Sequence, residues 1–130
     1  MKKTIKYSII SLATLTCIGI GTLSAATYSK TISTNVSYGS QCTGKISDKA
    51  SVNSSSLDWS FTLNGSTVST KNGYSFAKPY TSSVTYSSGR TVATQKVGYY
   101  FYNSLGNSTG GGIKTAKFTY SNNSVSGSFN

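Results

Sequence analysis

Side chains that could support acid–base, nucleophilic or metal chemistry are scarce in this 130-residue sequence. It contains no His, and its only acidic residues are Asp48 and Asp58. General acid–base catalysis normally draws on His, Asp or Glu, and a Ser–His or Cys–His nucleophile is excluded without His. The two carboxylates fall on separate predicted strands, so a glycosidase-type pair is only an alternative. No motif selects a Ser–Lys pair or a set of metal ligands. We predict a protein that is not an enzyme and needs no metal or cofactor.

Aromatic and basic residues gather in two runs that we expect to be neighbouring strands. Tyr combines a flat apolar ring with a polar tip, which suits sugar rings, lipid head groups or anionic polymers. The alternative is that Tyr builds the sheet and Lys keeps it soluble. The predicted binding surface consists of Lys96, Tyr99, Tyr100, Tyr102, Lys114, Lys117 and Tyr120.

The first 26 residues are predicted to be a secretory signal peptide. Lys2, Lys3 and Lys6 precede a largely apolar run over residues 9–23, and small residues follow as a cleavage site. Cleavage after Ala26 leaves residues 27–130 as one domain, with nine basic residues against two acidic ones and a net charge of +7. We expect a secreted, extracellular protein whose charge favours anionic partners.

Cys42 is the one cysteine of the predicted mature chain. An intramolecular disulfide is therefore excluded, and the core must be stabilised by packing. Two alternatives remain for this thiol: it is buried, or it pairs with a second chain.

Residues 57–63 are predicted to form a half-buried strand, because apolar and polar residues alternate there. The apolar positions are Leu57, Trp59, Phe61 and Leu63. Asn64-Gly65 and Asn72-Gly73 are both typical of two-residue hairpin turns, so we predict a three-stranded meander. The bulk opposite Trp59 is expected from residues 97–102.

Further alternating segments cover residues 30–38, 45–53, 83–86, 90–103, 113–120 and 124–129. Asp48 interrupts an apolar face, which suggests a strand end or a bulge. Gly89 is expected to hold a positive φ in a turn, and residues 103–112 are expected to be a mobile glycine loop. No helical pattern follows the signal helix. The sequence thus predicts an all-β fold, namely an antiparallel β-sandwich or small barrel of about eight strands.

Four functions agree with these observations. The leading hypothesis is a cationic protein that binds anionic cell-surface material, either cell wall or membrane, in a bacteriocin-like or toxin-like role. The alternatives are a self-assembling matrix protein, a glycan-binding module and a toxin that inserts a β-hairpin into a membrane to form a pore. Nucleic acid is not favoured as a partner, and oligomers are expected to form through strand edges or Cys42.

Overall fold

The computed structural model describes residues 25–130, which form eight β-strands. This part of the chain contains no helix, so the all-β prediction is confirmed; none of its residues forms a helix long and apolar enough to cross a membrane. The predicted signal peptide lies outside the described residues, apart from its last two. The strands are β1 (Thr27–Tyr38), β2 (Cys42–Asn53), β3 (Trp59–Thr70), β4 (Ser75–Phe76), β5 (Tyr80–Tyr86), β6 (Val92–Tyr102), β7 (Ser108–Ser121) and β8 (Ser124–Phe129).

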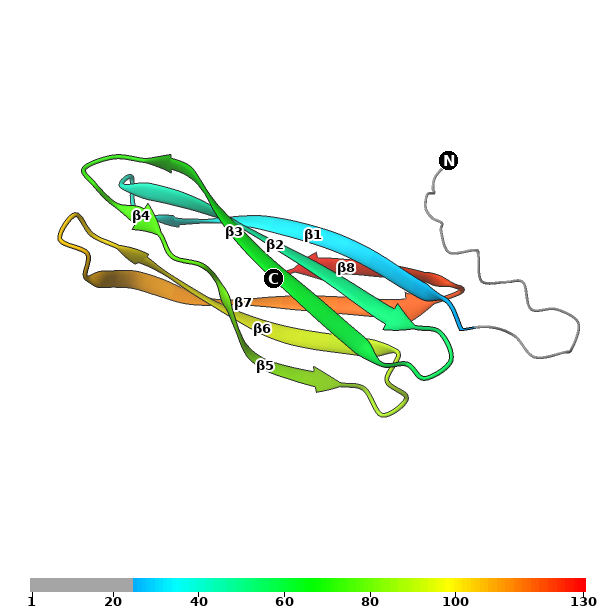
Figure 1. Ribbon diagram of the computed structural model, residues 1–130. Coiled ribbons are helices and arrows are strands. Elements are labelled where there is room, and N and C mark those ends of the chain that lie inside the picture. Colours follow the sequence, from blue (N-terminus) through cyan, green and yellow to red (C-terminus); the bar gives the residue numbers. More distant parts are fainter. Residues whose placement is uncertain (1–24) are drawn as a thin grey trace, which may run out of the picture.

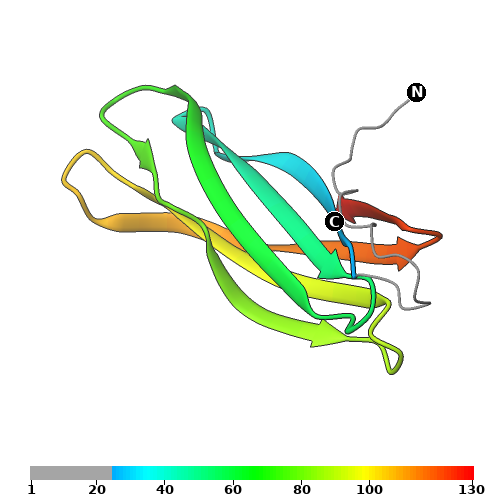
Figure 2. The same ribbon diagram turned by 45° about the vertical axis from the view of Figure 1, so that its right-hand side comes forward.

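The strands form two antiparallel sheets that lie one over the other (Figure 1). The three-stranded sheet has the order β1-β2-β3, and the five-stranded sheet has the order β4-β6-β7-β8 with β5 also paired to β6. The chain changes layers after β3, as the turned view in Figure 2 shows. Both sheets are long and twisted, and their facing sides enclose the core.

The β1–β2 hairpin follows the predicted alternation. Its register runs unbroken from the pair Thr27–Asn53 to the pair Tyr38–Cys42. Ile32 and Ile46 are buried on the face that points to the other sheet. The expectation for Asp48 was wrong, because it lies in the middle of β2, between Ile32 on one neighbour and Leu63 on the other.

The predicted hairpin at Asn64-Gly65 is wrong. β3 continues through both residues, which pair with Ser47 and Ile46 of β2. Pro79 lies in the segment that connects β4 to β5, and a Cβ on Gly65 would overlap its Cδ atom. Gly in a strand interior often marks such a close approach of another segment. The glycine is therefore needed for packing between the layers. The meander prediction was wrong because it took the same dipeptide for a hairpin turn.

The second dipeptide, Asn72-Gly73, does form a turn. Both residues have a positive φ, of 57° and 76°, as a type I′ turn requires. The strand that follows pairs with β6 instead of returning along β3. This turn therefore carries the chain from one sheet to the other.

The three consecutive glycines belong to a strand and not to a mobile loop. The β6–β7 connection is limited to residues 103–107, and β7 begins at Ser108. Gly110, with φ 58°, is the extra residue at the irregularity where Tyr100 pairs with Gly111 and Phe101 with Thr109. Glycine at positive φ is typical of one class of β-bulge. The bulge adds twist to this end of the five-stranded sheet.

The core that residues 25–130 form contains two apolar clusters. The first surrounds Trp59 and includes Ala93, Ala116, Phe118 and Val125. The bulk opposite Trp59 therefore comes from β7 and β8 as well as β6, and the expectation that residues 97–102 supply it was wrong. The second cluster consists of Val36, Cys42, Ile46, Val97 and Phe101.

Trp59 is fixed by the turn between β5 and β6. Its indole Nε1 donates a hydrogen bond of 2.8 Å to the carbonyl of Arg90. Arg90 Nε donates in turn to the carbonyl of Leu57 at 3.2 Å. Arg90, and not Gly89, takes the positive φ in this turn, at 59°. The two sheets are thus joined at this end through polar as well as apolar contacts.

Candidate binding surface

The predicted binding surface divides between the two faces of the five-stranded sheet. Successive residues of a strand point to opposite faces, so Tyr99 cannot share a face with Tyr100 and Tyr102. Tyr99 points inward and meets Phe101 edge-on, with ring centroids 6.1 Å apart. The inner face also takes Lys114 and Tyr120, whereas the outer face takes Lys96, Tyr100, Tyr102 and Lys117.

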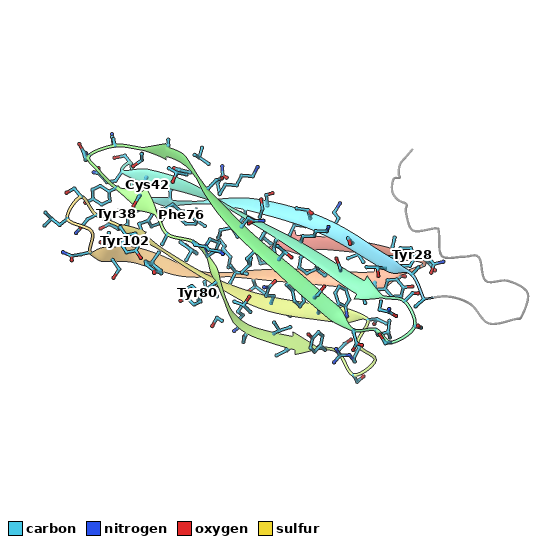
Figure 3. The ribbon with its side chains drawn as sticks, viewed as in Figure 1. Tyr28, Tyr38, Cys42, Phe76, Tyr80 and Tyr102 are labelled. Carbon is cyan, nitrogen blue, oxygen red and sulfur yellow. The ribbon has the colours of Figure 1, made fainter. Side chains whose placement is uncertain are left out.

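Tyr120 has a structural role near the first cluster. Its ring lies 5.8 Å from that of Tyr28, and its hydroxyl donates to Asn123 Oδ1 at 3.1 Å. Burial, followed by the nearby Tyr28, raises the pKa of Tyr120. These contacts leave Tyr120 half-buried at the opposite end of the molecule from Tyr102 (Figure 3 labels Tyr28 at that end).

The outer face of the five-stranded sheet carries a strip of three tyrosines, Tyr80, Tyr100 and Tyr102, which we call the tyrosine strip. The rings of Tyr80 and Tyr100 have centroids 6.5 Å apart. Those of Tyr100 and Tyr102 are 5.4 Å apart in an edge-on arrangement, and their hydroxyls are hydrogen-bonded at 3.2 Å. Tyr102 lies toward the end of the molecule that carries Cys42 (Figure 3). The strip therefore offers a row of aromatic surface along one face.

Sequence reasoning missed Tyr80. It pairs with Gly98 of β6, and its ring occupies the space that a side chain at Gly98 would fill. Cross-strand cover of a glycine by an aromatic ring is a known device for stabilising sheets. Tyr80 is 50% exposed, as is Ile113 on the other side of Gly98. The only available signal was the combination of a strand glycine with a tyrosine after Pro79.

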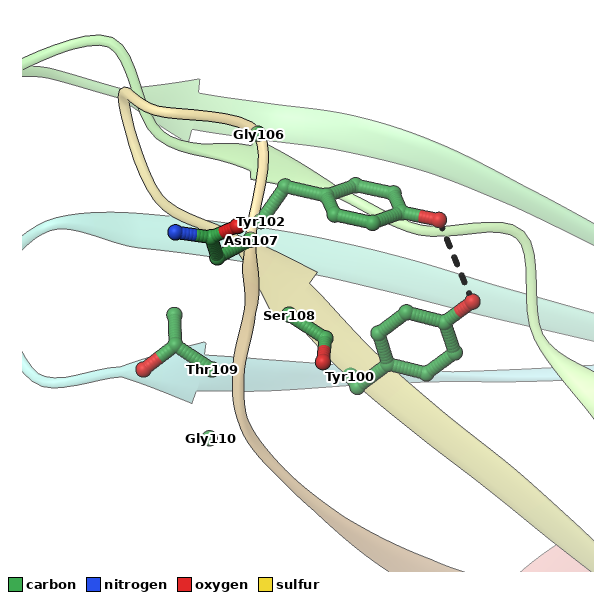
Figure 4. A pocket seen from close by; sticks show the side chains of 7 residues that line it. All are labelled: Tyr100, Tyr102, Gly106, Asn107, Ser108, Thr109 and Gly110. Carbon is green, nitrogen blue, oxygen red and sulfur yellow. Dashed lines mark hydrogen bonds between the residues drawn. The ribbon is translucent and has the colours of Figure 1, made fainter.

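A shallow, open hollow of about 540 Å³ adjoins the tyrosine strip (Figure 4). One wall is formed by Tyr100 and Tyr102 and the other by the start of β7. Polar groups available to a ligand there include the Asn107 amide and the Ser108 hydroxyl, whereas the Thr109 hydroxyl donates to the Tyr38 hydroxyl at 3.2 Å. The lining residues are Tyr100, Tyr102, Gly106, Asn107, Ser108, Thr109 and Gly110.

The loop beside this hollow is held in shape by Asn103. Its Oδ1 accepts hydrogen bonds from the backbone N–H of Leu105 at 2.9 Å and of Asn107 at 3.0 Å. Its own N–H donates to the Asn107 carbonyl at 2.9 Å. Leu105 stands at the tip of this loop with 82% of its surface exposed. An apolar side chain is thus presented to solvent next to the tyrosine strip.

Within the tyrosine strip, the environment of the Tyr100 hydroxyl raises its pKa. The hydrogen bond with Tyr102 is the main cause that raises the pKa of Tyr100, and the proximity of Tyr102 and Tyr80 adds to it. A neutral phenol donates one hydrogen bond and accepts others. The Tyr100 phenol therefore stays neutral at neutral pH and can both donate to and accept from a ligand.

Positive charge on the described surface is almost unopposed. Residues 25–130 contain nine basic side chains and two carboxylates, of which Asp48 is fully buried and Asp58 exposed. Lys96 and Lys117 lie on the outer face of the five-stranded sheet, and Lys45 and Lys49 lie on the outer face of the three-stranded sheet. Asp58 is thus the one exposed side-chain carboxylate in this part of the chain. Anionic ligands meet little repulsion on either face.

The two carboxylates do not form a pair. Asp48 pairs with Leu63 of β3 and faces the core, whereas Asp58 precedes β3 and is exposed. Leu63 lies five residue steps along the chain from Asp58, which is about 16 Å at roughly 3.3 Å per step of extended chain. Among residues 25–130, no three His, Cys, Asp or Glu side chains come together as ligands of a metal ion.

Comparison with known proteins adds no family to this description. No family model matches the chain, and neither the curated proteins nor the solved structures contain a match.

Proposed function

We propose that this protein is a secreted, non-enzymatic binding protein for anionic cell-surface material, and that the tyrosine strip is its contact surface. The observation that carries the proposal is the row formed by Tyr80, Tyr100 and Tyr102 on an outer sheet face, beside a hollow lined with hydroxyl and amide groups. The excess of exposed basic side chains over exposed carboxylates supports the anionic character of the partner.

A cell-wall polymer that carries both sugars and negative charge fits this surface best. Tyrosine rings bind flat apolar faces such as those of sugar rings, while their hydroxyls stay hydrogen-bonded. Asn107 and Ser108 in the adjoining hollow add hydrogen-bonding groups that fix orientation. Lys96 lies on the same face, two residues along β6 from Gly98, on which the Tyr80 ring packs. Stacking would provide contact area, and lysine would provide attraction at a distance.

The two sheet faces allow a matched test of charge. The double variant Lys96→Glu and Lys117→Glu changes the face with the tyrosine strip, whereas Lys45→Glu and Lys49→Glu makes the same change in net charge on the opposite face. We expect co-sedimentation with purified cell walls to fall about tenfold for the first pair and clearly less for the second. Binding of the unaltered protein should weaken as salt rises, because exposed charges are screened. Binding that is absent, or insensitive to salt, contradicts the proposal.

A matched pair of tyrosine variants tests the strip itself. Tyr100→Ala removes the central ring, while Tyr86→Ala removes a partly exposed ring that lies over Arg90, 4.1 Å from its Cζ. Loss of one stacking ring is worth about 1 kcal/mol, or roughly fivefold in affinity. We expect this loss for Tyr100→Ala alone. Equal binding by both variants would place the contact surface elsewhere.

A neutral glycan is the second candidate ligand, because the strip and its hollow carry no charge of their own. In that case binding would depend on Tyr100 but not on salt or on Lys96 and Lys117. Measuring the binding of the protein to uncharged and to phosphate-bearing preparations of the same cell-wall glycan distinguishes the two candidate ligands.

A further inference from the structure

The long edge of the three-stranded sheet formed by β3 has no partner in the part of the chain that the structure describes. β3 pairs with β2 on one side only. No other backbone hydrogen bond involves residues 60–67 there. We call residues 60–67 the open edge. Its unpaired N–H and C=O groups form a template for another strand.

The other edges of the two sheets are better protected. β1 lies against β8, as Figure 1 also shows, and β4 contains two residues. β5 follows Pro79 and has a shifted register between Thr81 and Ser83. Proline, short strands and bulges are the usual devices that prevent pairing at an edge. The edge of β3, in contrast, has none of these devices over the residues that precede its bulge.

The open edge itself contains neither a charged residue nor proline. A bulge follows at Val68, where Thr67 pairs with Gly44 and Ser69 with Thr43. Bulges twist a strand away from a flat partner. The region available for pairing thus ends near Thr67, after eight residues, which corresponds to about 26 Å of strand.

We propose that the open edge pairs antiparallel with the open edge of a second copy of this chain. A two-fold axis brings the same strand to both sides of the contact, so that each copy supplies the partner the other lacks. The pairing juxtaposes no charges, because the edge is neutral, although both copies carry a net positive charge. Phe61 and Leu63 are only half-buried at this edge and would be covered further by the second strand.

The register of such a dimer is restricted by the faces of the sheet. Residues directly opposite each other in an antiparallel pair point to the same face. Ser60 and Asn64 lie on the outer face, in rows with Ser51 and Ser47 of β2, whose β1 neighbours are Ser29 and Ser33. These rows would continue into the second copy. The result would be one six-stranded sheet with a polar outer face.

The rows that contain Ser60 and Asn64 allow an experiment with a matched control variant. Ser60→Lys with Asn64→Lys adds two charges at the open edge, and Ser29→Lys with Ser33→Lys adds them in the same rows at the protected β1 edge. Sedimentation velocity of the purified protein would be measured over about 0.01 to 1 mM, where interfaces of modest size associate. We expect the unaltered chain to dimerise, and more strongly at higher salt because repulsion between two positive copies is screened.

The edge variant should raise the dimer dissociation constant at least about tenfold, while the β1 variant should leave it nearly unchanged. A chain that stays monomeric throughout the range, or equal effects of the two variants, would overturn the proposal. Amide hydrogen exchange of the unaltered chain gives a second measurement that needs no variant to fold. Exchange within residues 60–67 should slow as concentration rises, and exchange that does not depend on concentration there would also overturn it.

Discussion

Asp48 and Gln95 face each other across the space between the two sheets, and both side chains are fully buried. The Gln95 amide donates to the Asp48 carboxylate and accepts a hydrogen bond from the Thr81 hydroxyl at 2.8 Å. This polar contact lies between the two apolar clusters and joins β2, β5 and β6. Burial raises the pKa of Asp48 from 3.8 to about 6.

Asp48 is expected to make stability depend on pH. The pKa of Asp48 is higher in the folded than in the unfolded state. Its contribution to the free energy of unfolding is therefore complete below about pH 4 and is lost as the pH rises through about 6. A shift of this size corresponds to roughly 3 kcal/mol lost by pH 7. Asp48→Asn should flatten this dependence in urea unfolding between pH 4 and 8. Asp58→Asn removes an exposed carboxylate and should leave the slope unchanged; if both variants keep the slope, Asp48 is not its source.

Gly65 is expected to tolerate no side chain. Gly65→Ala would force the new methyl group against Pro79, because the two segments are already in contact. Overpacking of this kind costs about 1 to 3 kcal/mol. Gly89→Ala is the control, since no other atom lies within 4 Å of the position that its new methyl group would take. Thermal unfolding should show a lower midpoint for the first variant only; an unchanged midpoint would mean that the two layers are less tightly packed there.

Trp59 is expected to stabilise the fold through its hydrogen bond as well as its ring. Trp59→Phe removes the donor to the Arg90 carbonyl, and the loss of a buried bond together with packing should cost about 2 kcal/mol or more in unfolding free energy. Tyr86→Phe, which keeps an exposed ring near the same Arg90, should change stability by less than about 0.5 kcal/mol. Equal stability of the two variants in urea titrations would be inconsistent with a buried Trp59.

Tyr102→Phe is expected to lower the pKa of Tyr100, because its hydrogen bond with Tyr102 is the main cause that raises this pKa. Carbon-13 NMR of the tyrosine ring carbons over an alkaline titration measures each phenol separately. Tyr86→Phe serves as the control and should leave the Tyr100 titration where it is. A Tyr100 pKa that does not move in Tyr102→Phe would show that the two hydroxyls are not bonded in solution.

The faces of the strands were predictable from sequence, whereas the partners of several strands were not. Alternation placed Ile32, Val36 and Ile46 correctly in the core, because a period of two needs only local information. Asn64-Gly65 and Asn72-Gly73 have the same local signal, and only the second forms a turn. Asn64 and Gly65 pair with β2, and Pro79 approaches Gly65 from the other layer, and no local pattern contains these contacts.

The binding surface, too, could be predicted from the sequence only in part. Residues 99–102 are all aromatic, and a continuous aromatic run does not indicate which side chains face outward until the neighbours of the strand are known. The structure places Tyr100 and Tyr102 outward and Tyr99 inward, and it adds Tyr80 through its pairing with Gly98. Cross-strand neighbours of this kind lie far apart in sequence, so composition identified the residue types and not their grouping.

Cys42 is 2% exposed, at the first position of β2, and is the one cysteine in residues 25–130. A thiol reagent can therefore reach it only when this end of the molecule opens. The rate at which Cys42 is labelled under native conditions would report how often the β1–β2 hairpin separates from Phe101 and the second cluster. The chain thus contains its own reporter of local opening, close to the end where the tyrosine strip terminates.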